Sequence, residues 1–272
     1  MEIYKNLRFF ILINNLEIFL TIYRYIKSLP LRFPYRLIKK SVRKKKLRAL
    51  EFKRFRKYCE HLPDIVNQPF FVKIGANDGI TNDPCSDLLI NNKKWKGLLV
   101  EPLPHIYHKL MLNFNDQERF LLEEAAISKS EGEKMFYYID PEYEKDNPVL
   151  LRYNQLIGSF SIDHILKHDS GTLKPYIKSR SVRIYKLNNL LKKNSIKKID
   201  LLHIDAESHD YEVLKTLDFN DYLPAIILIE HNHLSEEDVS EMVKLLTVNG
   251  YDVKDCGIDF FALNKKVYYG LK

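Results

Sequence analysis

The sequence predicts an α/β protein built on a doubly wound, mostly parallel sheet with helices on both faces. Short apolar runs alternate with helix-like segments from about residue 68 onward, as they do in α/β domains. The first run, Phe70–Ile74, leads into a glycine turn, and the second, Gly97–Val100, ends at an acidic residue, Glu101. Sheets of this kind bind their ligands in turns at the carboxyl ends of the strands.

The composition suits one domain with a large core and no disulfides. The chain has 272 residues, of which 45% are hydrophobic, enough for a single core with an appendage. Its three cysteines, Cys59, Cys85 and Cys256, are far apart and form no CxxC pair. The sequence therefore predicts neither a zinc knuckle nor a disulfide framework. A reducing compartment suits it best, and we expect a cytoplasmic protein.

The positive charge is confined to an N-terminal arm, which we expect to span residues 1–62. Residues 1–57 hold 17 Lys and Arg against 3 acidic residues, which gives +14, so the rest of the chain carries −7 of the overall +7. A nucleic-acid-binding surface on the main domain is therefore not predicted. The segment LRFFILINNLEIFLTIYRYI is apolar with a polar stripe at helical spacing. A spanning helix would bury Glu17 near its middle, which is costly, so we expect an amphipathic helix on a membrane surface or a partner.

A strongly basic run follows at residues 36–57, with twelve Lys and Arg and a single acid, Glu51. Beside an amphipathic helix, such a run suits an anionic lipid surface, at roughly 1 kcal/mol per basic residue. It would place the protein peripherally at the inner face of a membrane. The alternative is a solvated helix whose apolar residues pack on the domain, among them Leu47, Leu50 and Phe55.

The main domain is expected over residues 63–272, because prolines between 63 and 69 mark a boundary. Its first half has the order of a βαβ unit. In chain order we expect a strand over Phe70–Ile74, a tight loop over Gly75–Gly79, a helix capped by Asp83 with Pro84 at its first position, a strand over Gly97–Val100 and a helix over Pro104–Phe114.

The second half continues this alternation and ends in a hairpin. In chain order we expect a third strand over Phe120–Ser128, a short extra strand over Glu133–Ile139, a fourth strand over Ile199–Ile204, a helix from Tyr211 to Leu217, a fifth strand over Ala225–Ile229, a helix capped by Ser235 with Asp238, and antiparallel strands over Gly250–Asp255 and Ile258–Leu263.

Residues 140–180 lack clean periodicity and are treated as an insertion before the fourth strand. An insertion at this point can form a substrate lid, with aromatic side chains that stack on sugar faces. The alternative is a local core under a long loop. The candidate side chains are Tyr143, Tyr153, Phe160, His164, His168 and Tyr176.

The turn after the first strand favours a cationic nucleoside as ligand. Its glycines, Gly75 and Gly79, form GxxxG and not the GxGxxG of dinucleotide sites, and Asp78 and Asp83 add negative charge. Carboxylates here would repel a pyrophosphate, which prefers bare backbone N–H groups. S-adenosylmethionine carries a sulfonium and an ammonium and no phosphate. Glu101, at the tip of the second strand, is suited to accept hydrogen bonds from both ribose hydroxyls.

Five separated motifs resemble the FkbM family of S-adenosylmethionine-dependent methyltransferases: FVKIGANDG, GLLVEP, AAIS, GSFS and IDLLHIDAESHDYEVLK. The similarity runs from about Phe70 to about Leu263. It implies a class I methyltransferase fold with a seven-stranded, Rossmann-like sheet, and O-methylation of a sugar or another hydroxyl compound. By this resemblance Gly75, Asn77, Asp78 and Gly79 hold the methionine portion of the cofactor, Glu101 holds the ribose, and Ala125 and Ala126 lie near the adenine.

One position departs from this pattern. Many methyltransferases carry an acid two residues before the first glycine, where this chain has Lys73. The methionine ammonium group loses one potential partner, and Asp78 or Asp205 is expected to replace it.

Two polar clusters are expected to meet at the carboxyl edge of the sheet. DAESHD follows the fourth strand and EHNH follows the fifth. Methyl transfer to a hydroxyl needs a positioned nucleophile and a base of near-neutral pKa. His209 and His231 are the two candidates for the base, and Asp205 is the candidate for positioning the substrate or contacting the methionine ammonium group.

The same clusters contain groups that could bind a metal. Asp205 with Glu230 or Asn232 offers oxygen ligands for Mg²⁺, and the histidines suit a softer metal better. The alternative is that these residues are helix caps and surface polar groups that bind no metal. We favour this alternative and predict no metal site, with Mg²⁺ as the less favoured cofactor.

The sequence thus predicts a S-adenosylmethionine-dependent O-methyltransferase acting on a saccharide, glycolipid or natural-product intermediate. Two alternatives stay open at this point. One is a non-catalytic nucleoside-binding or scaffold module with the same fold, which Lys73 favours. The other is an NAD-dependent sugar oxidoreductase, which the acidic glycine turn disfavours.

Overall fold

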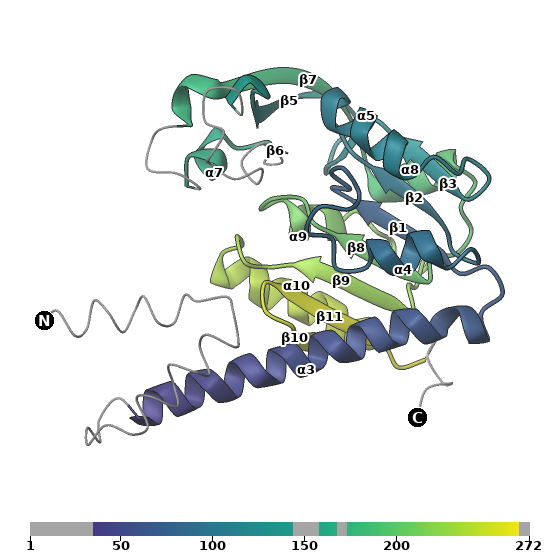
Figure 1. Cartoon of the computed structure of the whole chain (residues 1–272), viewed down its shortest axis with the longest axis vertical. Coiled ribbons are helices and arrows are strands. Elements are labelled where there is room, and N and C mark those ends of the chain that lie inside the picture. Colours follow the sequence, from purple (N-terminus) through teal and green to yellow (C-terminus); the bar gives the residue numbers. More distant parts are fainter. Residues whose placement is uncertain (1–34, 144–157, 168–172, 267–272) are drawn as a thin grey trace, which may run out of the picture.

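The computed structural model describes residues 35–143, 158–167 and 173–266, and it contains two sheets (Figure 1). The larger sheet has seven strands in the order β10-β11-β9-β8-β1-β2-β3. All neighbours pair in parallel except β11, which is antiparallel to both β9 and β10. Its strands are β1 Phe70–Ile74, β2 Lys96–Val100, β3 Phe120–Glu123, β8 Leu201–Ile204, β9 Ile226–Glu230, β10 Tyr251–Asp255 and β11 Asp259–Asn264.

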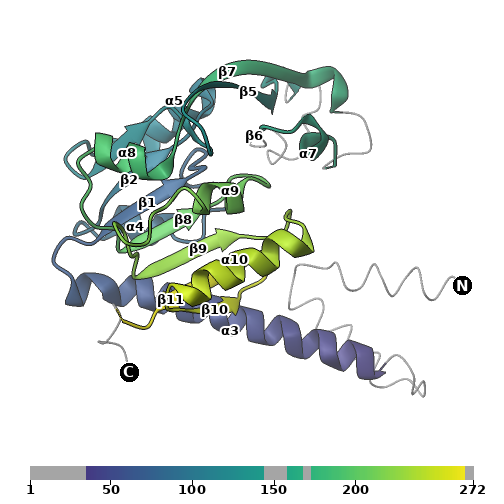
Figure 2. The same ribbon diagram turned by 180° about the vertical axis from the view of Figure 1, so that it is seen from behind.

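Helices cover both faces of this sheet, as the sequence predicts (Figures 1 and 2). Strands buried on both sides need an apolar layer on each face, and the core accordingly divides into two clusters. One cluster joins the sheet to α3 Tyr35–Ile65, α4 Ser86–Asn91 and α5 Pro104–Asn113, and the other joins it to α8 Leu187–Lys193, α9 Asp210–Leu214 and α10 Glu236–Val248.

The smaller sheet was not predicted. Its four strands, in the order β4-β7-β5-β6, are β4 Ala126–Ile127, β7 Ile177–Tyr185, β5 Gly132–Ile139 and β6 Gly158–Ser159. The helix α7 Ile162–Lys167 and a 3₁₀ turn, η2 Lys174–Tyr176, lie beside it. Figure 1 shows this sheet standing above the edge of the larger one.

One expectation about this region was wrong. The single strand expected over Phe120–Ser128 is broken, because the chain turns at Ala125, whose N–H bonds to the Glu123 carbonyl at 3.1 Å, and then enters the smaller sheet. The stretch 140–180, which the sequence analysis treats as an insertion, contains the start of β7, a strand that was not predicted. Most of the first half of β7 is exposed, so its sequence lacks the apolar alternation that would have revealed a strand.

The helix after the first turn also differs from its prediction. It starts at Ser86 with Cys85 as the N-cap, and no side chain caps it. Asp83 is not the N-cap: one of its carboxylate oxygens accepts from the Cys85 N–H at 2.9 Å, one residue before the helix, and the other pairs with Lys73. By contrast, Ser235 caps α10 as expected, with its hydroxyl accepting from the Asp238 N–H at 3.1 Å.

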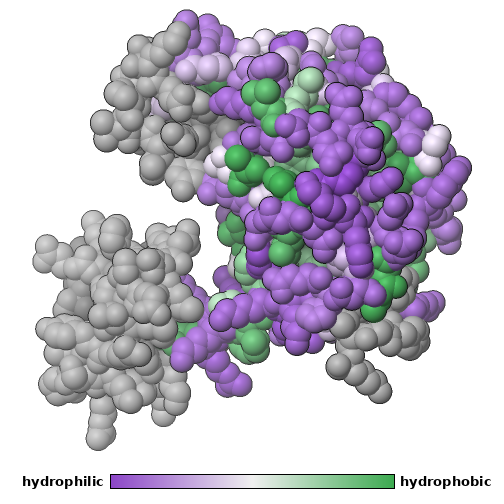
Figure 3. Space-filling model, turned by 45° about the vertical axis from the view of Figure 1, so that its right-hand side comes forward, coloured by the Kyte–Doolittle hydropathy of each residue, from purple (hydrophilic) through white to green (hydrophobic). Residues whose placement is uncertain are grey.

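The described part of the arm is one long helix that packs on the domain at its C-terminal end. Phe55, Cys59 and Leu62 are fully buried against the sheet, whereas Leu47 and Leu50 are about half exposed, at 52% and 53%. Residues 1–34, which include the predicted amphipathic segment, lie outside the described part of the chain. Among the helices that the structure describes, none is both long enough and apolar enough to span a bilayer. The surface seen in Figure 3 is mainly hydrophilic with scattered apolar patches.

Candidate active site

A cavity of about 340 Å³ opens where the carboxyl ends of β1, β2, β8 and β9 meet the smaller sheet. The strands supply its floor, and Phe136, Gly158 and Phe160 of the smaller sheet and its loop supply the opposite wall. This is where open α/β sheets bind ligands. Of the ten residues proposed above for the site, seven line the cavity: Gly75, Asn77, Glu101, Ala125, Ala126, Asp205 and His209.

The first glycine of the turn is required by a close backbone approach. Gly75 has φ +71°, and a Cβ placed on it would lie 1.7 Å from the Asp205 carbonyl oxygen. The N–H groups of Gly75 and Ala76 both donate to the Val100 carbonyl, at 3.1 and 2.9 Å. Glycine therefore lets the β1 turn pass between the ends of β8 and β2, which no residue with a side chain can do here.

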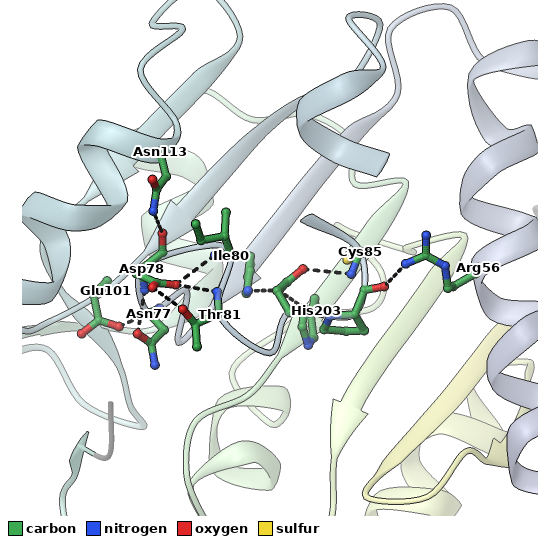
Figure 4. Close-up of polar contacts among 12 residues, drawn as sticks. Arg56, Asn77, Asp78, Ile80, Thr81, Cys85, Glu101, Asn113 and His203 are labelled. Carbon is green, nitrogen blue, oxygen red and sulfur yellow. Dashed lines mark hydrogen bonds and ion pairs between the residues drawn. The ribbon is translucent and has the colours of Figure 1, made fainter. Parts of the chain in front are cut away.

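Two other residues of the turn support it from outside the cavity. The Asp78 carboxylate accepts from the N–H groups of Ile80 and Thr81, at 3.0 and 2.7 Å, and from the Thr81 hydroxyl at 2.6 Å. Gly79 packs on Phe114, the C-cap residue of α5, and a Cβ placed on Gly79 would lie only 2.4 Å from that ring. Neither residue lines the cavity, whereas Gly75 and Asn77 of the same turn do. The contacts of Asp78 with Ile80 and Thr81 are drawn in Figure 4.

Glu101 joins the two turns that flank the cavity. Its Oε2 accepts from the Asn77 N–H and its Oε1 from the Leu103 N–H, both at 3.0 Å, and only 6% of the residue is exposed (Figure 4). Burial raises the pKa of this carboxyl to about 7. Each carboxylate oxygen keeps a further lone pair for a donor such as a ribose hydroxyl.

The raised pKa of Glu101 predicts that cofactor affinity rises with pH. The ionised carboxylate is the better hydrogen-bond acceptor and attracts a cationic cofactor. With a pKa of about 7, S-adenosylmethionine should bind about tenfold more weakly at pH 6 than at pH 8. The measurement is calorimetric titration across that range. Glu101→Gln should bind weakly throughout with a shallower dependence, to which Asp205 still contributes. A wild-type affinity that is flat between pH 6 and 8 would contradict this role.

Lys73 lines the cavity, is almost fully buried and is paired. Only 4% of it is exposed, and its ammonium group forms an ion pair with the buried Asp83 carboxylate. The pKa of Asp83 is lowered by Lys73 despite burial, which opposes that shift. His203 Nδ1 lies 3.8 Å from the same carboxylate, and burial together with Lys73 lowers the His203 pKa to about 4. The lysine that departs from the expected pattern therefore has an internal partner, a contact that sequence spacing did not reveal.

Three carboxyl groups converge at the other end of the cavity. Asp205, Asp210 and Glu230 place one oxygen each within 4.8 Å of one another. Burial and mutual repulsion raise their pKa values, that of Asp205 to about 7 and that of Glu230 to about 10. Among the described residues, Asp210 Oδ2 and Glu230 Oε2 are buried and accept no hydrogen bond.

These buried oxygens without partners fit the cationic cofactor that the sequence predicts. A sulfonium and an ammonium group would both be stabilised by carboxyl groups that lack other partners. Glu101 lines the same cavity together with Asp83 and the acidic end, and a lining so rich in carboxyl groups disfavours a pyrophosphate. Asp210 and Glu230 belong to the predicted polar clusters, yet their convergence depends on the pairing of β8 with β9.

The two histidine candidates lie in different places. His209 lines the cavity, with Nε2 3.3 Å from the Ser128 hydroxyl and its ring against Phe160, and burial with nearby Lys134 lowers its pKa to about 4. His231 does not line the cavity, and its ring stacks on Phe260 at 4.0 Å. The sequence did not distinguish His209 from His231 as the candidate base, but only His209 lies in the cavity lining.

Comparison with known proteins shows the family of the chain. A family model described as the methyltransferase FkbM domain matches residues 73–253. No curated protein matches the chain. Among solved structures, the precorrin-6y C5,15-methyltransferase of Geobacter metallireducens is similar at TM-score 0.40 and 9% identity, over 81% of this chain and 88% of that one. The fibrillarin pre-rRNA processing protein of Methanococcus jannaschii is similar at TM-score 0.37 and 12% identity, over 74% and 68%.

A third similar structure, the fibrillarin of Aeropyrum pernix with bound S-adenosyl-L-methionine, has TM-score 0.34 and 11% identity, over 78% of this chain and 75% of that one. The family match covers the glycine turn, Glu101, both polar clusters and the smaller sheet. The strand order, with β11 antiparallel beside β9, is that of the class I methyltransferase sheet named above. The chain belongs to the FkbM methyltransferase family and is a S-adenosylmethionine-dependent methyltransferase.

Proposed function

We propose that the enzyme transfers a methyl group to a hydroxyl of a saccharide or glycolipid intermediate. The observation that carries this proposal is His209 in the cavity wall. Burial lowers its pKa to about 4, so the imidazole is neutral at physiological pH and keeps a ring nitrogen that can accept a hydrogen bond from the acceptor hydroxyl. A neutral acceptor facing the cavity suits a hydroxyl, which must lose its proton during methylation.

The proposed roles follow from the cavity lining. Bound S-adenosylmethionine supplies the electrophilic methyl group. Gly75 and Asn77 would hold its methionine portion, Glu101 its ribose, and Ala125 and Ala126 would contact its adenine. Asp205 would meet the ammonium group or position the acceptor, because it belongs to the acidic end of the cavity and its backbone lies against Gly75 of the β1 turn.

The wall opposite the sheet supports a sugar-like acceptor. Phe136 and Phe160 form an edge-to-face pair with ring centroids 5.0 Å apart, and both line the cavity. Aromatic faces bind the apolar faces of sugar rings, while Glu207 and His209 offer acceptors for hydroxyls at the same opening. Of the predicted lid residues, Tyr153 and His168 lie outside the described part of the chain.

The test of this function is mass spectrometry of cell-surface glycans from cells with and without the protein. We expect one additional methyl group on a defined sugar when the protein is present. Purified enzyme with labelled S-adenosylmethionine should transfer label to that glycan. Label that reaches only protein or nucleic acid would contradict the proposed acceptor, and absence of cofactor binding by calorimetry would contradict the enzymatic assignment itself.

The contrast between the two histidines gives a second prediction. His209→Ala should lower kcat by about 10²–10⁴-fold with little change in cofactor affinity, because His209 faces the acceptor side of the cavity. His231→Ala is the matched control, since His231 lies outside the cavity lining. Steady-state kinetics and calorimetry on both variants give the measurement. A larger loss of kcat in the His231 variant would contradict the assignment.

We also propose that the arm contacts an anionic membrane surface. On the described part of α3, an exposed face carries Arg43, Lys44, Lys46 and Lys53 together with the half-exposed Leu47 and Leu50. Exposed basic residues around apolar side chains complement an anionic lipid surface. Glycolipid intermediates would then be near the cavity.

Vesicle sedimentation tests this contact. The full-length protein should bind vesicles rich in anionic lipid and not neutral ones. The double variant Lys46→Glu and Lys53→Glu should bind at least tenfold more weakly, since each basic residue contributes about 1 kcal/mol. The matched control is Lys129→Glu with Lys186→Glu, which changes the net charge equally at exposed sites that follow β4 and precede α8 and do not belong to α3. If both double variants lost the same affinity for anionic vesicles, the net charge of the protein and not the exposed face of α3 would explain binding, which would contradict the proposal.

A further inference from the structure

Three groups of side chains in the described ranges bring potential metal-ligand atoms of His, Cys, Asp or Glu within 4.8 Å of one another. Two of them are explained above. One contains the carboxylate that pairs with Lys73, and the other forms the acidic end of the cavity. The third group consists of His164, Glu207 and His233, and nothing in the proposed reaction uses it as a unit.

This third group joins three segments that are far apart in the sequence. His164 belongs to α7 in the insertion, Glu207 to the loop after β8, and His233 to the loop after β9. His164 Nε2 lies 2.9 Å from Glu207 Oε2, and the two imidazole rings meet edge to face with centroids 4.8 Å apart. His164 is only 4% exposed. The group therefore forms the junction between the smaller sheet's helix and the carboxyl edge of the larger sheet.

The donor set has the composition of a transition-metal site. Two imidazoles and one carboxylate bind Zn²⁺ and related divalent ions, at about 2.0–2.2 Å per ligand. Ligand atoms around a tetrahedral ion of that size lie roughly 3.4 Å apart, so atoms now within 4.8 Å need to move by little more than about 1 Å. The geometry points to a divalent transition-metal site formed by His164, Glu207 and His233, which joins the insertion to the catalytic edge.

The surroundings of the group support this assignment. Glu230 Oε1 lies 3.6 Å from His233 Nε2, and a carboxylate beside a ligating imidazole commonly orients the ring. The Ser159 hydroxyl donates to the Glu207 carbonyl at 3.2 Å, so a second contact already joins the same two segments. Since Glu207 and Phe160 both line the cavity, a metal held here would keep the aromatic wall closed over the acceptor position.

The test is metal binding to the full-length protein after treatment with a chelator and in the absence of S-adenosylmethionine. Titration with Zn²⁺ by calorimetry should show one saturable equivalent, and Co²⁺ should produce the visible absorption of a ligated ion. His164→Ala and His233→Ala should each weaken Zn²⁺ binding at least tenfold while they retain the wild-type circular dichroism spectrum. His108→Ala, which removes an exposed histidine on α5, should leave the affinity unchanged.

A second measurement uses hydrogen exchange and does not depend on the affinity. Zn²⁺ should slow amide exchange over residues 158–167 in the wild type and leave it unaltered in the His164 variant. The site is overturned if the wild type binds no single equivalent of Zn²⁺, if either ligand variant keeps the wild-type affinity, or if exchange in this segment does not respond. In those cases the three side chains form a hydrogen-bonded contact without a metal. The outcome is independent of which acceptor the enzyme methylates.

Discussion

Gly75→Ala is expected to abolish cofactor binding and to destabilise the fold by at least about 3 kcal/mol. A Cβ at this position would lie 1.7 Å from the Asp205 carbonyl oxygen, and φ is +71°. The obstacle is backbone at the end of a buried strand, which has no rotamer to change. Relief therefore requires β1 and β8 to separate at the cavity floor. Urea denaturation and calorimetric titration with S-adenosylmethionine give the two measurements.

Gly132→Ala is the matched control for this variant. Gly132 also has a positive φ, +113°, but nothing lies within 4 Å of a Cβ built on it. It therefore carries the conformational strain without the collision, and we expect a loss of about 1–3 kcal/mol in the free energy of unfolding with unchanged cofactor affinity. Similar behaviour of the two variants would show that strain alone explains the requirement for glycine and would contradict the close approach.

Breaking the buried pair of Lys73 and Asp83 is the second large effect that we expect. Lys73→Met leaves a carboxylate that is almost fully buried without its cation, which should cost about 3–5 kcal/mol in the free energy of unfolding. Asp83→Leu leaves the ammonium group in the same position. The double variant should recover most of either loss, because two apolar side chains need no partner. A double-mutant cycle by urea denaturation gives the measurement, and additive losses would contradict the pairing.

His203 provides a pH test of the same pair. Its pKa is lowered to about 4 by burial and by Lys73, below the value of about 6.5 for an unfolded histidine. The unfolded chain thus binds the extra proton between these values, so His203 by itself should lower stability by about 3 kcal/mol as pH falls from 6.5 to 4. This contribution is measured as the difference between the wild type and His203→Gln, because the raised pKa values of Glu101 and Asp205 change the stability of both proteins in the opposite direction. In Lys73→Met the Asp83 carboxylate favours protonated His203, so that loss should shrink. An equally steep loss in both proteins would contradict the arrangement.

Much of the site was predictable because the β1 turn and the strand ends are local patterns. An apolar run before glycines and an acid after the next run locate Gly75, Asn77 and Glu101, and the parallel topology brings them to one edge. The pattern of residues within the turn does not show which of them line the cavity and which only support the turn from outside. Asp78 and Gly79 stand in the same turn as Gly75, but only the packing of α5 and the hydrogen bonds to Thr81 show that they face away from the cavity.

The sequence alone determined the larger sheet, the cofactor class and the edge at which the chemistry occurs, because each follows from periodicity and turn residues within short stretches. The tertiary structure decided the partner of Lys73, the choice of His209 over His231 for the cavity wall, and the meeting of α7 with the loops after β8 and β9. It also decided the smaller sheet, whose exposed strand β7 carries little apolar alternation. These features depend on contacts between segments 10 to about 80 residues apart. The pairing of strands that are distant in the chain, such as β8 with β1 and β9, sets those contacts, and no short stretch of sequence specifies it.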